Sequence, residues 1–600
     1  MKGIAIGLSN NSKEILKRLK KTEFVKDIYI AGSSKDDGKE NELIQVQKPR
    51  EILLKKWPEI DLIIFIGSIA ASIRIINSFL TSKDQDPGVI VIDNKCSKIV
   101  PLIGLHQSNT QNIACQIANL LGGEIIETNN SNDQSFLNLD AFGNQWGWKR
   151  SGKINDWSKL VIKQAKNEEI FCKQLSGNSL WKNSESGEII NQINEKEIEK
   201  PDSTFHVSIF ENHETTWHPP VLWIGIGCER NTSKELIANS LNNFLESGNL
   251  SQQSIAGFAT IDIKKDEKGI LELSEEKNLP IKFFSKEDLS TIIVPNPSNV
   301  VQKEIGTPSV AEASCLLAAG EESKLLEEKR IFKNQSGAVT IAVAESKNQY
   351  NPTHGEIHII GSGPGDISFL TSNAKKALSR CTVWIGYKMY LDLIKSLKRS
   401  DQVLIESKLT EEKERCSKAI KLAEEGIKVA LISSGESGFY GMAGLLLELL
   451  QKIKKEYRPY FEVHPGISSV QLAAAISGAP LMNDFCSVSL SDKLTPWSLI
   501  EKRIEGALVG DFVIALFNPQ SIERNWQLKS VIDICLQSRH GDTPVLIARQ
   551  VGRENQTKKF FTLNTIPFKE IDMLSIIIIG NSQTTLVDEI FLTPRGYLQN

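Results

Sequence analysis

The chain has 600 residues, of which 40% are hydrophobic and 24% are charged, and its formal net charge is −3. Because a single hydrophobic core stops growing at about 250 to 300 residues, a chain of this length is expected to form several domains. The composition is that of ordinary globular proteins and excludes a fibrous or largely disordered chain. The near-balanced charge forms no clustered basic face in the sequence, which disfavours nucleic acid as a partner.

Cysteine usage and apolar runs bear on the cellular location. The nine cysteines are scattered singly, with no C-x-x-C pair and an odd total, so they predict neither a metal site nor a disulfide framework. This usage fits a reducing, cytoplasmic location. The first residues show no signal-peptide pattern, and the longest apolar runs, such as residues 62–73, fall short of the about 18 residues that a membrane span needs. We therefore expect neither export nor a membrane partner.

Polar, Asn-rich segments divide the chain at residues 128–135, 182–206 and 345–356. Such compositions bury too little apolar surface to form cores, so we expect linkers or long loops there. A fourth segment, residues 139–181, is rich in tryptophan and poor in strand-like runs, which predicts a small α+β insert.

Three of the blocks contain a short apolar strand that runs straight into glycine, and a helical pattern follows each one, at residues 3–9, 222–230 and 357–366. Alternation of strands and helices with short glycine turns predicts a multidomain α/β protein with parallel-type sheets.

The stretch "IHIIGSGPGDISFLT" at residues 357–371 looks like a cofactor loop. A dinucleotide fingerprint, G-x-G-x-x-G, needs its third glycine on the first helical turn, whereas Gly361, Gly363 and Gly365 are spaced two apart. Asp366 would also repel a pyrophosphate. These features disfavour a nicotinamide or flavin oxidoreductase, and they leave open a plain strand-to-helix turn.

Two further loops follow strands in the same block, "LISSGESGFYGMAG" at 431–444 and "FEVHPGISSVQLAAAISGAPL" at 461–481. Three strand-end loops should meet along one edge of a sheet, where α/β proteins place ligands. Together with GSGPGD, these loops resemble the tetrapyrrole methyltransferases. That resemblance implies the two-lobed fold of class III methyltransferases and S-adenosylmethionine as the cofactor.

The resemblance narrows farther along the chain. The signatures "SLSDKLTPW" and "NPQSIERNWQL", with the run at 542–556, are similar to the precorrin-3B C17-methyltransferase family, which also contracts the macrocycle. The match covers roughly residues 356–585. One departure is the family's Gly-Asp-Pro loop, which is Gly435-Glu436-Ser437 here and loses the rigid proline.

The resemblance also implies which residues hold the cofactor and the substrate. Cofactor contacts would come from Pro364, Ser434, Gly435, Glu436, Phe439, Ser468, Ser469, Leu516 and Val551. Carboxylates of a precorrin or cobalt-precorrin would be bound by Lys388, Arg524, Arg549 and Arg553, each of which has a solvated surface charge as its simpler interpretation. Asp366 and Glu436 are the predicted catalytic residues, although Asp366 could equally cap the helix near Thr371 or its preceding turn. Members of this methyltransferase family commonly form dimers, so the resemblance leaves a homodimer through this domain open.

The first 345 residues are similar to cobalt-precorrin-5A hydrolases, which open a lactone on the corrin ring and release acetaldehyde. The sequence predicts four domains. They are an N-terminal α/β domain at 1–127, a middle domain with its linker at 136–220, a C-terminal hydrolase-like domain at 221–345 and the methyltransferase domain at 356–600. Where the hydrolases have G-H-x-G-G-A-N, this chain keeps only the histidine, His106, a predicted substrate-binding residue. If the lost glycines let the backbone approach the macrocycle, residues 1–345 would be a non-catalytic corrinoid-binding module, which is the alternative to a bifunctional enzyme.

Three other residues have a chemical and a structural interpretation. Cys228 has no histidine near it in the sequence, and a small buried core residue is the favoured interpretation. Glu312 is interpreted as a helix residue that faces solvent. His464, which precedes Pro465 at a strand end, is interpreted as a structural histidine rather than a catalytic one.

Overall fold

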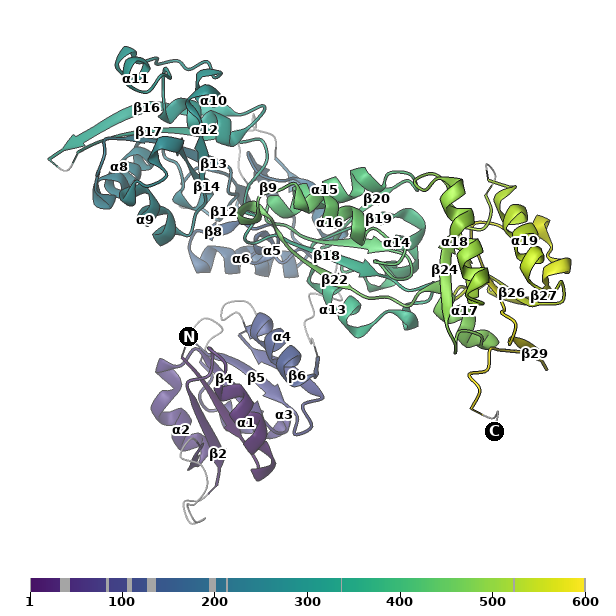
Figure 1. The fold of residues 1–600 in the computed structure, drawn as a ribbon. Coiled ribbons are helices and arrows are strands. Elements are labelled where there is room, and N and C mark those ends of the chain that lie inside the picture. The colour runs from purple at the N-terminus through teal and green to yellow at the C-terminus, as the bar shows by residue number, and fades with distance from the viewer. Residues whose placement is uncertain are drawn as a thin grey trace. The chain divides into compact units, whose positions relative to one another are not determined.

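The computed structural model describes residues 2–32, 44–81, 86–104, 110–126, 136–193, 201–211, 214–335, 337–521 and 524–597. The chain divides into two compact units, Met1–Gln134 and Ser135–Asn600. Each unit contains sheets flanked by helices (Figure 1), so the expected multidomain α/β class is confirmed. The finer domain boundaries stay predictions. Within the described ranges, none of the helices combines the length and apolarity that a membrane crossing requires.

The first unit is a sheet with helices on both faces. Its strand order is β3-β2-β1-β4-β5-β6-β7. Among the described strands of this sheet β5 and β6 are the one antiparallel pair, so β6 and β7 run opposite to the others. The strands are β1 (Gly3–Gly7), β2 (Asp27–Ala31), β3 (Ile44–Gln47), β4 (Leu62–Ile66), β5 (Gly88–Ile92), β6 (Lys98–Ile103) and β7 (Glu124–Ile125). Helices α1 (Lys13–Lys20) and α4 (Thr110–Leu121) cover one face, and α2 (Pro49–Lys56) and α3 (Ile69–Ile76) cover the other. Alternating apolar side chains of β4 feed both cores.

The second unit begins with a small sheet of order β10-β9-β11-β12-β8, which we call the middle sheet. Its strands are β8 (Lys149–Ser151), β9 (Phe171–Gln174), β10 (Asn191–Gln192), β11 (Thr204–Val207) and β12 (Thr216–His218), with helices α5 (Phe142–Gln145), α6 (Ile154–Ala165) and α7 (Glu185–Glu188). Phe142 packs edge-to-face here against Trp148 of the predicted insert and against Trp217 of β12.

A second sheet of order β15-β14-β13-β17-β16 follows. Its strands are β13 (Leu222–Cys228), β14 (Ile255–Ile261), β15 (Ile281–Phe284), β16 (Lys324–Asn334) and β17 (Gly337–Glu345). The helices are α8 (Lys234–Ser247), α9 (Lys268–Lys277), α10 (Lys286–Ser290), α11 (Asn299–Glu304) and α12 (Ala311–Ala319). Gly225 lets α12 approach β13, because a Cβ there would lie 1.8 Å from the carbonyl oxygen of Ala311.

The rest of the chain forms two lobes, the first at 356–468 and the second at 469–597. The first lobe has five parallel strands in the order β20-β19-β21-β18-β22. They are β18 (Glu356–Gly361), β19 (Val383–Tyr387), β20 (Val403–Ser407), β21 (Lys428–Ser433) and β22 (Tyr460–His464), with α13 (Ser372–Arg380), α14 (Lys388–Ile394), α15 (Glu412–Glu424) and α16 (Ala443–Gln451).

The second lobe is a mixed sheet of order β24-β25-β28-β26-β27. Its elements are α17 (Ser469–Ser477), β24 (Phe485–Ser489), α18 (Trp497–Val509), β25 (Val513–Phe517), α19 (Gln527–Ser538), β26 (Pro544–Arg549), β27 (Thr557–Thr562) and β28 (Ser575–Ile579). A three-stranded sheet of β23 (Gly478–Ala479), β29 (Thr585–Val587) and β30 (Ile590–Leu592) completes it.

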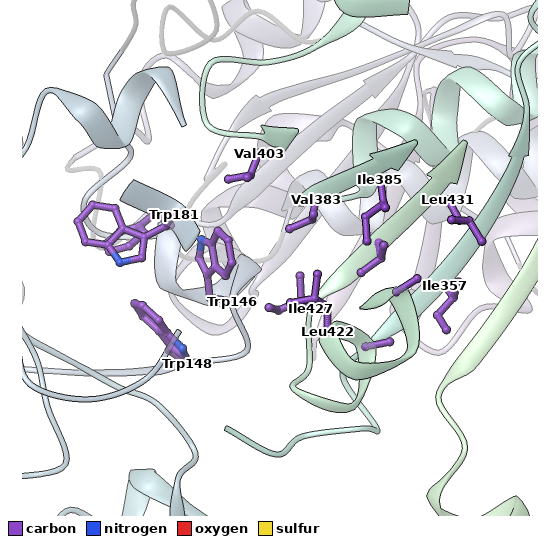
Figure 2. Close-up of a cluster of buried hydrophobic side chains, with 14 of the residues drawn as sticks. Trp146, Trp148, Trp181, Ile357, Val383, Ile385, Val403, Leu422, Ile427 and Leu431 are labelled. Atoms are coloured by element: carbon purple, nitrogen blue, oxygen red, sulfur yellow. The ribbon is translucent and has the colours of Figure 1, made fainter. Parts of the chain in front are cut away.

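The middle sheet and the first lobe share one hydrophobic core. Trp146, Trp148 and Trp181 belong to the same buried cluster as apolar residues of β18, β19 and β21. Figure 2 shows Trp146 beside Val383 and Ile427 of the first lobe. We call this cluster the shared core.

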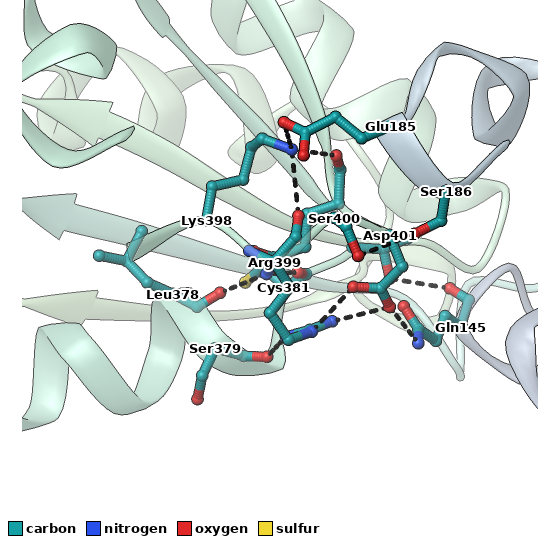
Figure 3. A network of polar contacts seen from close by, with 12 residues as sticks. Gln145, Glu185, Ser186, Leu378, Ser379, Cys381, Lys398, Arg399, Ser400 and Asp401 are labelled. Atoms are coloured by element: carbon teal, nitrogen blue, oxygen red, sulfur yellow. Dashed lines mark hydrogen bonds and ion pairs between the residues drawn. The ribbon is translucent and has the colours of Figure 1, made fainter. Parts of the chain in front are cut away.

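Polar contacts frame the shared core (Figure 3). The Gln145 amide donates to Asp401 at 2.8 Å, the Ser186 hydroxyl donates to Ser400 at 2.8 Å, and the Lys398 ammonium lies 3.0 Å from the Glu185 carboxylate. Lys398 and Asp401 are largely buried, whereas Glu185 is exposed, so these contacts are only partly shielded from water.

Residues 345–356, expected as a linker or a long loop, form a loop that packs against the rest of the unit. Gln349 is 2% exposed, and its side-chain amide donates to the carbonyl oxygens of Trp146 at 2.6 Å and Glu425 at 2.7 Å. Its carbonyl oxygen accepts from the indole of Trp148 at 2.7 Å. A polar side chain is buried here because its hydrogen bonds are made by segments that lie far apart in the sequence.

Candidate functional site

The three strand-end loops of the first lobe meet at one edge of its sheet. Strands β18, β21 and β22 are adjacent and parallel; Gly361 ends β18, and Gly435 and Gly466 lie just after β21 and β22. A Cβ at Gly466 would lie 2.0 Å from the Gly435 carbonyl oxygen and 2.6 Å from that of Gly361. Gly363 and Gly435 also form an antiparallel bridge. The floor of the site is therefore bare backbone, because no side chain fits between these loops.

The second lobe closes on this floor through the loop after β26. The amide of Asp366 donates to the carbonyl oxygen of Gly552 at 2.7 Å, and a Cβ at Gly365 would lie 2.1 Å from that oxygen. The Arg553 guanidinium donates to the Pro364 carbonyl oxygen at 3.4 Å. The loop Gly363–Asp366 is thus held between the two lobes.

A crevice of about 180 Å³ lies between the lobes. Its lining comes from both lobes: Pro364, Tyr390, Ser434, Gly435, Glu436, Phe439, Tyr440, Ser468, Ser469, Phe517, Asn518, Gln550, Val551, Arg553 and residues 573–576. The rings of Phe439, Tyr440 and Phe517 lie within 5.0–5.2 Å of one another and form an aromatic wall. The crevice therefore combines exposed backbone, hydroxyls and π surfaces, the features of a small-molecule site.

Strained backbone gathers at this crevice. Tyr440, Asn518 and Gln550 have left-handed φ angles of 56°, 49° and 51°. Such conformations cost about 1–3 kcal/mol each for residues other than glycine and persist only when the surroundings impose them. Their presence along one crevice supports its choice as the candidate functional site.

Eight of the nine predicted cofactor residues line the crevice, all except Leu516. The side chain of Leu516 is buried in the core beneath β25, whereas its neighbours Phe517 and Asn518 border the crevice. Alternation along a strand puts Leu516 on the opposite face. A cofactor role for these nine residues stays a prediction.

Each of the two predicted catalytic carboxylates accepts a hydrogen bond from a backbone amide of its own loop. The Asp366 carboxylate accepts a hydrogen bond from the Ser368 amide at 2.7 Å, caps the turn Ile367–Phe369 and is exposed. Hydrogen bonding from Ser368 lowers the pKa of Asp366, so the carboxylate is ionised. Glu436 lines the crevice and accepts from the Gly438 amide at 2.7 Å. The capping interpretation of Asp366 thus has direct geometric support.

The predicted basic residues separate into one at the crevice and three elsewhere. Arg553 lines the crevice and has no acidic partner among the described residues. Lys388 lies between Asp392 and Glu406, and Arg549 pairs with Asp572 at 2.7 Å. Their charges are already matched by carboxylates.

Arg524 has a positioning geometry. It is 9% exposed, and its guanidinium donates to the carbonyl oxygens of Leu490 and Asn518 at 3.1 and 3.2 Å. It thereby joins the ends of β24 and β25 and holds Asn518 at the crevice.

Sequence reasoning did not single out Tyr390, Tyr440, Phe517, Asn518 or Gln550 as lining residues. Asn518 lies inside the quoted "NPQS" signature, so its position one residue past a buried strand was a usable signal. Tyr390 and Gln550 had no such sequence signal. Tyr390 lies on α14 and Gln550 directly follows β26, and these elements border the crevice only in the folded chain.

In the hydrolase-like part, His106 lies outside the described residues, and its role stays a prediction. Burial raises the pKa of the Cys228 thiol to about 11, which leaves it without thiolate character at neutral pH. Glu312 was expected to face solvent, and that expectation is wrong. It is fully buried, accepts hydrogen bonds from Asn296 and the Lys329 amide, and leaves Oε2 without a partner among the described residues.

A second cavity, of about 540 Å³, lies between the sheet of β13–β17 and helix α15. Lys282 borders it, with its ammonium 4.1 Å from the Trp223 ring centre and 4.5 Å from that of Tyr350. Burial lowers the pKa of Lys282 to about 8. None of the predicted site residues lines this cavity.

Comparisons with known proteins bear on both parts of the chain. Residues 356–567 match the family model described as tetrapyrrole (corrin/porphyrin) methylases. A protein of Salmonella typhimurium named probable cobalt-factor III C(17)-methyltransferase is 44% identical over 241 residues, which are 40% of this chain and 99% of that protein. The chain belongs to the tetrapyrrole methylases.

Other relatives of the methylase extend the comparison. The cobalt-factor III methyltransferase of Priestia megaterium is 44% identical over 245 residues, and the chain spans 45% of its length and matches with 40% of its own. A crystal structure of the methyltransferase CobJ is 32% identical and covers 40% of this chain and 100% of its own, with a TM-score of 0.39.

The N-terminal part of this methylase matches two other family models. Residues 51–132 match the model described as cobalamin synthesis G N-terminal, and residues 222–344 match cobalamin synthesis G C-terminus. The recognition of a methylase fused to hydrolase-like domains is therefore confirmed.

Proposed function

We propose that this tetrapyrrole methylase transfers a methyl group from S-adenosylmethionine to C17 of a cobalt-precorrin-3-type ring and contracts the macrocycle, in corrin biosynthesis. The observation that carries the proposal is the crevice floor, where three loops that match the family's glycine motifs meet as bare backbone. The relatives named for cobalt-factor III support the cobalt-containing substrate over precorrin-3B. A cytoplasmic location and a homodimer through this domain belong to the same proposal.

The residues at the crevice fit the cofactor. When bound, S-adenosylmethionine supplies an already activated methyl group on its sulfonium. Ser434, Ser468 and Ser469 offer hydroxyls, and the Gly435 loop offers backbone groups. Phe439 and Phe517 present ring surfaces and exclude water from one wall. The protein must then hold the acceptor carbon in line with the bond between the methyl group and the sulfonium, since positioning supplies much of the rate in such a transfer.

Arg553 is the candidate for binding the substrate. A tetrapyrrole of this pathway carries acetate and propionate groups, and a guanidinium without an acidic partner among the described residues can pair with one of them. Arg524 and Glu436 act as positioning residues in this proposal, because each holds a crevice loop through the backbone.

Mass spectrometry of the products tests the reaction. The whole protein is incubated without oxygen with S-adenosylmethionine and cobalt-precorrin-3. Gain of one methyl group with a contracted, lactone-bearing ring is expected. Conversion of precorrin-3B alone would contradict the cobalt assignment, and conversion of neither would contradict the proposed reaction.

A matched pair of glycine substitutions tests the crevice. Gly466→Ala places a Cβ against the Gly435 carbonyl oxygen, so we expect cofactor affinity, measured by calorimetry with S-adenosylhomocysteine, to fall at least tenfold, about 1.4 kcal/mol. Gly506→Ala in α18 meets nothing within 4 Å and should leave the affinity unchanged. Equal affinities in the two variants would contradict the placement of the cofactor.

For residues 1–345, the first proposal is lactone opening with acetaldehyde release. The loss of the glycines around His106 favours the second, a module that binds a corrinoid without catalysis. Acetaldehyde released from cobalt-precorrin-5A by the whole chain would exclude the second. A bound but intact lactone would support it.

A further inference from the structure

Two histidines and a glutamate lie together beneath the crevice floor, on strands β18 and β22. These strands pair in parallel, with His358 opposite Glu462 and Ile360 opposite His464. The two-residue period of a strand puts His358, Glu462 and His464 on the same face of the sheet. This group is distinct from the crevice lining.

The ligand atoms of the three side chains form a small triangle. His358 Nδ1 lies 2.9 Å from His464 Nε2 and 3.9 Å from Glu462 Oε2, and His464 Nε2 lies 3.8 Å from the same oxygen. Two ligand atoms about 2.0–2.1 Å from a tetrahedral ion are roughly 3.3 Å apart. The triangle therefore needs shifts of only about half an ångström to enclose one ion.

The Glu356 carboxylate holds the His358 proton on Nε2. Glu356 Oε2 lies 2.8 Å from His358 Nε2, and Glu356 is itself held by Lys428 at 2.5 Å and Arg380 at 3.0 Å. Hydrogen bonding at Nε2 leaves the Nδ1 lone pair directed at the triangle. Metal-ligating histidines almost always have such a carboxylate or carbonyl partner on the second nitrogen.

Burial and access suit an ion that enters from solvent. His358 is 1% exposed and His464 is 5% exposed, so solvent does not compete for their nitrogens. Glu462 is 46% exposed in its side chain and opens the group to the surface. Two imidazoles and one carboxylate suit a borderline divalent ion rather than the hard ions Mg²⁺ and Ca²⁺.

We infer that His358, Glu462 and His464 bind one Zn²⁺ or Co²⁺ ion, with solvent completing the coordination. The ion clips edge strand β22 to β18. Because Pro465 and Gly466 follow His464 directly, the clip holds the loop that forms part of the crevice floor. The cysteine pattern of the sequence predicted no metal, and this donor set comes from histidines 106 residues apart.

Cobalt titration of the whole protein, stripped with a chelator and free of substrate and methyl donor, tests the inference. We expect one equivalent of Co²⁺ to give the intense visible d–d bands of a four-coordinate site, and Zn²⁺ to abolish them. No binding of Co²⁺ in this titration would show that the histidines form only a hydrogen-bonded pair. The outcome is independent of the proposed reaction, since no turnover is measured.

Four variants assign the site. Glu462→Gln removes a half-exposed ligand without disturbing the core and should weaken cobalt binding at least tenfold, and His464→Gln should abolish the bands. Glu356→Gln should weaken binding by about 10- to 100-fold, the usual effect of a lost outer-shell partner. His540→Ala, at an exposed histidine paired with Asp542, is the control and should bind as the parent does. Unchanged binding in Glu462→Gln and in Glu356→Gln would overturn the inference even if His464→Gln fails to fold.

Discussion

The N-terminal unit and the middle sheet both precede the methylase domain, yet they are built in different ways. The unit Met1–Gln134 has its own cores on the two faces of its sheet. The middle sheet has no such independence, because its tryptophans belong to the shared core with β18, β19 and β21 of the methylase. Domains that are fused along one chain can therefore keep separate hydrophobic cores or share a single core. The methylase domain and the middle sheet share a single core.

The strongest test of this difference removes a tryptophan from the shared core. Trp146 is 2% exposed and packs against the first lobe, so Trp146→Ala should cost about 3–5 kcal/mol. Hydrogen exchange should show lost protection in β19, within the methylase, as well as in the middle sheet. Ile162→Ala, at a 54% exposed position on α6, is the matched control and should change little. Loss of protection confined to the middle sheet would mean that the cores are separate.

The next test removes the buried amide of Gln349. Gln349→Ala leaves the carbonyl oxygens of Trp146 and Glu425 and the Trp148 indole without this partner, and we expect a loss of about 2–3 kcal/mol. Thermal unfolding followed by calorimetry measures it. Asn348→Ala, at the exposed neighbouring position, should be neutral. If both variants melt alike, the loop 345–356 contributes no specific contact.

A pH-dependent test uses Glu425, which accepts from the Asn178 amide at 2.5 Å. Burial raises the pKa of Glu425, so the folded chain holds this proton more tightly than the unfolded chain does. Its contribution to stability is thus present below the unfolded pKa and is lost as the pH rises through the folded pKa. Glu425→Gln should stabilise the protein by roughly 0.5–2 kcal/mol at neutral pH and by less at acidic pH. Glu414→Gln, exposed on helix α15, which ends just before Glu425, should show no such trend in denaturation curves at the two pH values.

The smallest effect is expected from removing the N-terminal unit. A chain that begins at residue 135 keeps the shared core and both lobes intact, so methyl transfer should stay within about twofold of the parent rate. The rate of cobalt-precorrin-3 methylation measures it. A large loss would show that the first unit takes part in methyl transfer.

The sequence was sufficient for some of these features and insufficient for others. Apolar strands that end in glycine are local patterns, and for this reason the convergence of the loops at Gly361, Gly435 and Gly466 could be predicted. The burial of Gln349 could not be, because a polar loop reads as solvated until its distant partners are known. Glu312 was missed for a similar reason, since helix α12 is buried on the face that carries its carboxylate.

The candidate site shows the same division. Its glycines and serines carry a recognisable spacing, whereas the left-handed Tyr440 and Gln550 are residue types that rarely adopt this conformation and give no local signal. Of the basic residues, only the folded chain shows which are matched by carboxylates, as Lys388 and Arg549 are.

The buried amine of Lys282 is a site for selective chemical labelling of the protein. With a pKa of about 8, a large share of Lys282 is the free base at slightly alkaline pH, where ordinary surface lysines remain protonated. An acylating dye small enough for the 540 Å³ cavity would therefore mark this amine ahead of the many others in the chain. A fluorophore fixed there, between Trp223 and Tyr350, would report by its emission on every motion of helix α15 against the neighbouring sheet.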